Sequence, residues 1–116
     1  MGLFSYQDKY DAFVAEIDGV RISCSEGAEE KENLAKEIAR AYGKKISDLA
    51  EFMLGEVCSM YGDMSLQDLI GALGIPLIDL DREIISYLEH TLDDYHIIDV
   101  EYSGVLDEFY EVIIDG

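Results

Sequence analysis

The spacing of apolar residues changes near Pro76, and that change limits the fold more than any other feature. Between residues 27 and 73, apolar side chains recur every three or four positions, which is typical of helices that bury one face. After Pro76 they recur at every second position, which is typical of half-buried strands. We therefore predict one α+β domain that spans residues 1–116.

Glycines divide the helical part of the sequence into three predicted helices. The first is predicted over 27–42, because its apolar residues form one stripe and Gly43 suits the position that follows a helix. The second is predicted over 45–61, where the apolar pattern extends over four turns. A short third helix is predicted over 66–73, with Ser65 as its N-cap. The pattern thus predicts two main helices and a short third one.

Strands are expected on both sides of these helices. A β-hairpin is predicted at 12–25, since Asp18-Gly19 separates two alternating segments and suits a two-residue turn. Short turn-rich breaks separate four further strands, predicted over 75–80, 83–91, 96–103 and 109–115. Consecutive strands with short breaks favour an antiparallel β-meander, and the helices are expected to pack on one face of that sheet.

Acidic residues are distributed unevenly along the chain. Residues 46–116 contain seventeen carboxylates and one basic residue, Arg82, so this part carries −16 of the net charge of −18. A field this negative repels nucleic acid and anionic lipid, and it attracts basic protein surfaces. The apolar fraction of 49% provides a real core, so the acidity does not indicate disorder. We expect a basic protein as partner, and neither nucleic acid nor a membrane.

The last two predicted strands place many of these carboxylates on one face. In both strands we expect the face that contains Val100 and Val112 to be the core face, with Tyr110 on that side. The other face mixes carboxylates with exposed apolar groups, which is typical of a protein-binding patch. Our candidate contact residues are Ile97, Asp99, Glu101, Phe109, Glu111 and Ile113. The alternative is a solvated face whose charges discourage pairing at the sheet edge.

Two histidines that flank a predicted turn form a second candidate site. His90 and His96 lie on either side of Asp93-Asp94, and imidazole with carboxylate can bind zinc or iron. The chain has no HExxH motif, no CxxC motif and no third spaced ligand. A polar hairpin end is therefore the alternative interpretation. We predict no cofactor and no metal, and a metal-dependent enzyme or small-ligand-binding domain around these residues stays a second hypothesis.

Three segments of the sequence support a resemblance to known small domains. They are EIDGVRISCS, MYGD and DDYHIIDVEYSGVLDEFYEVIIDG, in this order. In this order of elements the chain resembles small acidic bacterial domains of unknown function, and some similar families look like immunity proteins, which neutralise a toxin. The resemblance implies an α+β fold and a bacterial cytosolic origin, and it transfers no catalytic residue.

The N-terminal sequence and the apolar runs bear on location. The first six residues have no basic region and no long apolar stretch, and no apolar run approaches the length needed to span a bilayer. We therefore expect a cytoplasmic protein. With a charge of −18 opposing self-association, we expect a monomer or a weak homodimer.

Overall fold

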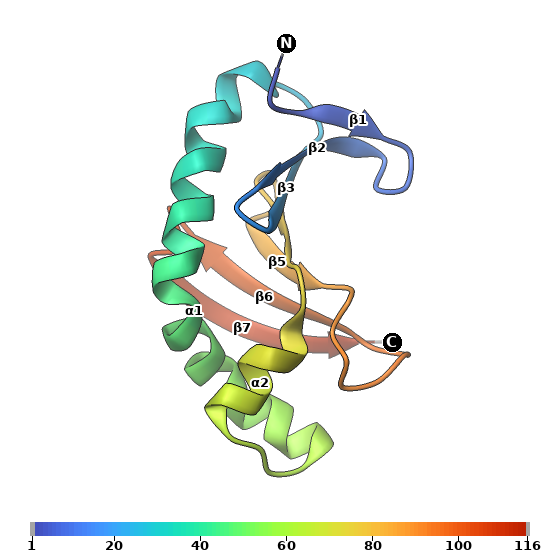
Figure 1. Ribbon diagram of the computed structural model, residues 1–116, viewed down its shortest axis with the longest axis vertical. Helices are drawn as coiled ribbons and strands as arrows, with labels where there is room; N and C mark the ends of the chain where they lie inside the picture. The colour runs from blue at the N-terminus through green and yellow to red at the C-terminus, as the bar shows by residue number, and fades with distance from the viewer. Residues whose placement is uncertain (1, 116) are drawn as a thin grey trace.

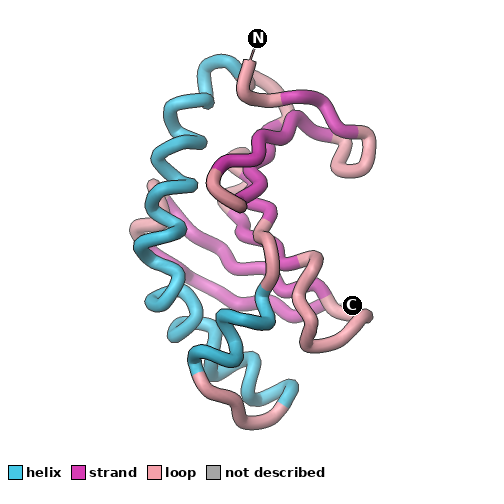
Figure 2. The backbone as a smooth tube through the Cα atoms, viewed as in Figure 1, coloured by secondary structure: helices cyan, strands magenta, loops and turns pink. Residues whose placement is uncertain are grey.

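The computed structural model describes residues 2–115 and has an α+β architecture, with helices along one face of a seven-stranded mixed sheet (Figures 1 and 2). The strands follow the chain in order across the sheet: β1 (Ser5–Gln7), β2 (Ala12–Ile17), β3 (Val20–Cys24), β4 (Leu77–Asp79), β5 (Ile84–Tyr87), β6 (Ile97–Ser103) and β7 (Glu108–Asp115). The helices are a short 3-10 turn η1 (Glu29–Lys31), α1 (Glu32–Tyr61) and α2 (Leu66–Leu73).

The hairpin and the C-terminal strands belong to one sheet, which differs from the prediction of a separate antiparallel meander. β3 pairs with β4 in parallel, and all other neighbouring strands are antiparallel. A parallel pair needs a long crossover connection, and α1 and α2 together provide it. The sequence pattern does not reveal this pairing, because alternation of apolar residues is the same in parallel and antiparallel strands.

The prediction of two main helices is wrong, because a single helix, α1, runs through Gly43. The apolar stripe of α1 stays in phase across this glycine, since Ala39, Tyr42, Ile46 and Leu49 continue the spacing of three and four. An interior glycine costs roughly 1 kcal/mol relative to alanine. Burial of the continuous stripe outweighs that cost, so the helix continues to Tyr61. The predicted short helix over 66–73 is α2, and the Ser65 side chain accepts a hydrogen bond from Asp68 N at 3.1 Å.

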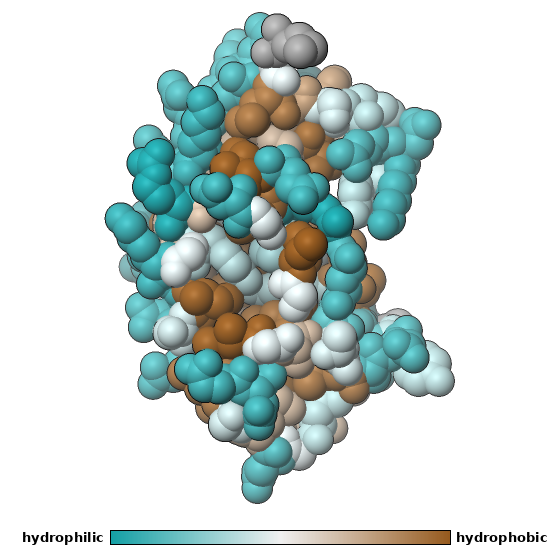
Figure 3. Space-filling model, in the orientation of Figure 1, coloured by the Kyte–Doolittle hydropathy of each residue, from teal (hydrophilic) through white to brown (hydrophobic). Residues whose placement is uncertain are grey.

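The core lies between α1 and the face of the sheet that it covers. Figure 1 shows α1 along the full length of the molecule, with α2 beside its C-terminal end. Fully buried side chains come from both layers, among them Ile38, Leu49 and Met53 of α1 and Ile85 and Ile98 of the sheet. We call the opposite face of the sheet the outer face. In Figure 3 hydrophilic side chains line the outer side of α1, and apolar surface runs along the middle of the molecule.

A β-bulge in β7 changes which residues face the core. Glu111 pairs with Glu101 and Phe109 pairs with Tyr102, so Tyr110 is the extra residue of β7. An inserted residue reverses the alternation of faces beyond that point. Phe109 therefore packs against the core, and Tyr110 is 57% exposed, with its hydroxyl 2.8 Å from Ser103 Oγ. This is opposite to the sequence prediction for these two residues.

Candidate protein-binding surface

The outer face of β4–β7 brings together side chains from four strands. The strand registers form one row in which Leu77, Ser86, Asp99 and Ile113 lie side by side. The neighbouring row contains, in order across the same strands, Asp79, Ile84, Glu101 and Glu111. No helix covers this face in the described part of the chain (Figures 1 and 2). The face therefore presents a mixture of apolar and acidic groups, most of them partly exposed.

Five of the six predicted contact residues share this face. Ile97 and Ile113 are 42% and 40% exposed, which is high for isoleucine and leaves apolar surface beside the charges. Asp99, which pairs with Ile113, and Glu101 are half-buried, and Glu111 is exposed. The sixth residue, Phe109, lies on the core face because of the bulge in β7.

The carboxylates in the middle of this face have no cation beside them. Glu101 and Glu111 are direct cross-strand neighbours, an arrangement that is destabilising for like charges. Among residues 2–115, the ion pairs within 4.0 Å include none to Asp99, Glu101 or Glu111. Asp99 accepts a hydrogen bond from Ser86 Oγ at 2.6 Å, which fixes its side chain without neutralising it. The fold thus carries an uncompensated negative charge at this place.

Four residues of these two rows were not among the predicted contacts: Leu77, Asp79, Ile84 and Ser86. Ile84 follows from the alternation of β5, in which Ile85 and Tyr87 are buried. Leu77 has no comparable signal, because β4 is only three residues long and its place beside Arg21 depends on the parallel pairing with β3.

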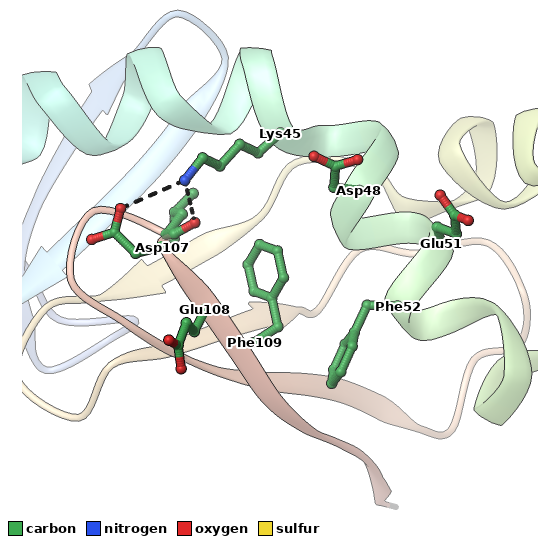
Figure 4. Close-up of a pocket in the computed structure, with 8 residues that line it drawn as sticks. Lys45, Asp48, Glu51, Phe52, Asp107, Glu108 and Phe109 are labelled. Atoms are coloured by element: carbon green, nitrogen blue, oxygen red, sulfur yellow. Dashed lines mark hydrogen bonds and ion pairs between the residues drawn. The ribbon is translucent and has the colours of Figure 1, made fainter.

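An open groove runs along the junction of α1 and β7 (Figure 4). Phe52 of α1 and Phe109 of β7 lie next to each other in it, with ring centroids 5.9 Å apart. Its cavity volume is about 510 Å³, and its lining residues are Lys45, Asp48, Glu51, Phe52, Leu106, Asp107, Glu108 and Phe109. Lys45 Nζ donates to Leu106 O at 2.8 Å and lies 3.7 Å from Asp107 Oδ1, so the one cation of the groove is already engaged by the protein. The groove therefore combines an aromatic surface with acidic margins.

The two histidines of the alternative hypothesis are close together, and local hydrogen bonds engage both ring nitrogens of His90 and Nδ1 of His96. His90 is buried, its Nδ1 accepts from Leu92 N at 3.1 Å, and its Nε2 lies 2.6 Å from His96 O. This pattern assigns the proton to Nε2 and leaves no lone pair for a metal. His96 Nδ1 lies 2.6 Å from Asp93 Oδ2, and Asp94 is exposed. Within residues 2–115, no group of three or more His, Cys, Asp or Glu side chains could hold a metal ion.

Asp93 organises the loop that contains these histidines. Its carboxylate accepts from the backbone N–H groups of Tyr95 and His96 at 3.1 and 3.0 Å, and from the Tyr61 hydroxyl at 2.8 Å. Partial burial raises the pKa of Asp93, but the hydrogen bonds outweigh it and hold the pKa well below its ordinary value. Burial, followed by the bond to Asp93, raises the pKa of Tyr61 to about 12. These contacts tie the loop to the C-terminal end of α1 and indicate a structural role.

Comparison with known proteins finds no matching family model, no matching curated protein and no matching solved structure. Across the residues that the structure describes, none of the helices has both the length and the apolar character needed to cross a membrane.

Proposed function

We propose that this chain is a non-catalytic protein-binding domain that engages a basic partner protein through the outer face of β5–β7. The observation that carries the proposal is the direct pairing of Glu101 with Glu111, next to Asp99, on a face that no helix covers within residues 2–115. Uncompensated like charges are unfavourable for folding, and such departures from the stable pattern are typical of functional sites. Exposed Ile97 and Ile113 add apolar contact surface beside these carboxylates.

An immunity or inhibitor role is the form of this function that we favour. Toxins that cut nucleic acid have basic active sites, and an acidic protein can occupy such a site by charge complementarity. The net charge of −18 would accelerate association by electrostatic steering, and added salt would reduce the effect. A bacterial cytoplasmic setting fits such a role, since the inhibitor must meet its toxin inside the cell.

Retention of a single basic protein from lysate at low salt, and its release at high salt, would name a partner for kinetic measurements. Reversal of two charges in Asp99→Lys/Glu101→Lys is expected to lower the association rate constant at low salt by about tenfold or more. The matched control is Glu26→Lys/Glu30→Lys, which changes the net charge equally at two exposed residues outside this face. An association rate that falls equally in both variants would refute the assignment to the outer face.

A second variant separates binding from folding. Glu101→Gln/Glu111→Gln removes the like-charge pair, so the free energy of unfolding is expected to stay equal or to rise by about 0.2–1 kcal/mol. Partner affinity is expected to fall in the same variant. A variant that loses stability and keeps its affinity would show that these carboxylates serve the fold and not recognition.

A further inference from the structure

β7 is the edge of the sheet, and it is long enough to accept another strand. It contains eight residues, Glu108–Asp115, and pairs on one side only, with β6. An edge strand leaves alternate backbone N–H and C=O groups without a strand partner. The opposite edge, β1, has only three residues, Ser5–Gln7, and offers far fewer such groups. β7 is therefore the edge at which strand addition has most to gain.

Both sides of this edge have surfaces that suit the side chains of an added strand. On the α1 side the groove exposes Phe52, which is 39% accessible, beside Phe109 (Figure 4). On the outer face, β7 presents Glu111, Ile113 and Asp115. Side chains of a strand alternate between the two faces of a sheet, so alternate side chains of a strand beside β7 would point to the α1 side, where the groove borders Glu108 and Phe109.

We propose that an extended segment of the basic partner adds to β7 as an eighth strand. Its apolar side chains lie in the groove over Phe52 and Phe109, and its lysine or arginine side chains lie on the outer face against Glu111 and Asp115. The inference rests on the proposed function for the basic character of the partner. It adds the binding mode, in which backbone hydrogen bonds join the partner to this chain and alternate side chains give specificity.

The negative charge of β6 and β7 disfavours the pairing of a second copy of the chain with the β7 edge. The strands β6 and β7 contain five carboxylates and no basic residue. A second β7 would bring its own Glu108, Glu111 and Asp115 to the same edge, and like charges opposite each other are destabilising. A strand with lysine or arginine converts the same positions into favourable cross-strand pairs.

The test uses the full chain labelled with nitrogen-15 and a synthetic ten-residue peptide in which lysine and valine alternate. A control peptide has proline at two central valine positions, which keeps its charge and removes two backbone donors. Strand addition is expected to shift the amide resonances of β7 and to slow their exchange with solvent. The control peptide is expected to bind about tenfold more weakly, because each backbone hydrogen bond contributes to affinity.

Two variants of α1 localise the bound side chains. Phe52→Ala is expected to weaken the alternating peptide about tenfold, since it removes half of the aromatic pair in the groove. The matched control is Leu34→Ala, which removes a side chain of similar exposure (37%) outside the groove. Leu34→Ala is expected to leave the affinity unchanged.

The outcomes distinguish this inference from the proposed function. In one outcome the peptide shifts the amide resonances of Asp99 and Glu101 while the β7 amides exchange with solvent as fast as in the free protein. That result overturns strand addition and leaves the outer face as the binding site. If the peptide still protects the β7 amides from solvent exchange in the Asp99→Lys/Glu101→Lys variant, strand addition is supported. The same result counts against the outer face of β6 as the binding site. Equal binding of the alternating and the proline-containing peptide, or no binding of either at millimolar concentration, also overturns strand addition.

Discussion

Replacement of Gly43 by alanine tests the central feature of the fold, the continuity of α1. A Cβ atom built at Gly43 meets no heavy atom within 4 Å, and the backbone there is not in the left-handed region. The added methyl group therefore has space and a compatible conformation. Had Gly43 been the residue after a separate helix over 27–42, alanine would have been strained at that position. The two arrangements thus predict opposite signs for one substitution.

The magnitude follows from helix propensity. Glycine in a helix interior is about 0.8–1.0 kcal/mol less favourable than alanine, so Gly43→Ala is expected to raise the free energy of unfolding by about 1 kcal/mol. For a chain of 116 residues this corresponds to a rise of about 4 °C in Tm. Urea unfolding followed by far-ultraviolet circular dichroism measures the change, with the m-value expected to stay constant.

Two glycines of the same helix serve as matched controls. Gly55 is also interior to α1 with no atom within 4 Å of a built Cβ, so Gly55→Ala is expected to stabilise equally. Gly62 ends α1 at φ +92°, so Gly62→Ala is expected to destabilise by about 1–3 kcal/mol. Destabilisation by Gly43→Ala together with stabilisation by Gly55→Ala would refute the continuous helix.

Three further predictions concern the core and the loop network. Leu49→Ala empties a fully buried position and is expected to cost about 2–5 kcal/mol in urea unfolding, with the m-value unchanged. The hydroxyls of Tyr42 and Tyr87 lie 2.7 Å apart, and burial raises the pKa of Tyr42 to about 12. Replacing either tyrosine with phenylalanine leaves the other hydroxyl without its hydrogen-bond partner and is expected to lower the free energy of unfolding by about 1–3 kcal/mol. In a double-mutant cycle the double variant should recover part of that loss. The pKa of Asp93 is lowered on folding, so its contribution to stability is complete above its ordinary pKa of 3.8 and is lost as pH falls through the folded value. The Asp93→Asn variant should therefore have a lower free energy of unfolding than the native chain at pH 7. The difference between the two should shrink below pH 3.8 when the free energy of unfolding is measured as a function of pH. A difference that stays constant with pH would contradict the role of the Asp93 charge.

The parts of the fold that follow from local periodicity were predictable, and those that depend on distant partners were not. The hairpin turn at Asp18-Gly19 is present, since β2 and β3 pair across it. The prediction that a helix ends before Gly43 was wrong, because the cost of glycine inside a helix is smaller than the free energy gained by burying a continuous apolar stripe. The parallel contact of β3 with β4 joins residues more than fifty positions apart, and no local signal reports it.

The candidate surface shows the same division at the level of single residues. Ile97, Asp99 and Glu101 share a face because alternation in β6 is regular. Phe109 and Tyr110 are exchanged relative to the prediction, because a bulge in β7 shifts the pleat by one residue. The bulge is set by how β7 pairs with β6, so reading β7 alone cannot reveal it.

By itself, the sequence determined the charge, the presence of a core, the α+β class and the alternation that separates Val100 from Glu101. These properties depend on composition and on spacing along the chain, which local physics converts directly into faces of helices and strands. Only the tertiary structure decided that α1 is one helix, that the sheet is continuous and mixed, and that Phe109 lies beside Phe52 in the groove. Each of these depends on free energy gained between segments distant in the chain, which outweighs local preferences of about 1 kcal/mol per residue.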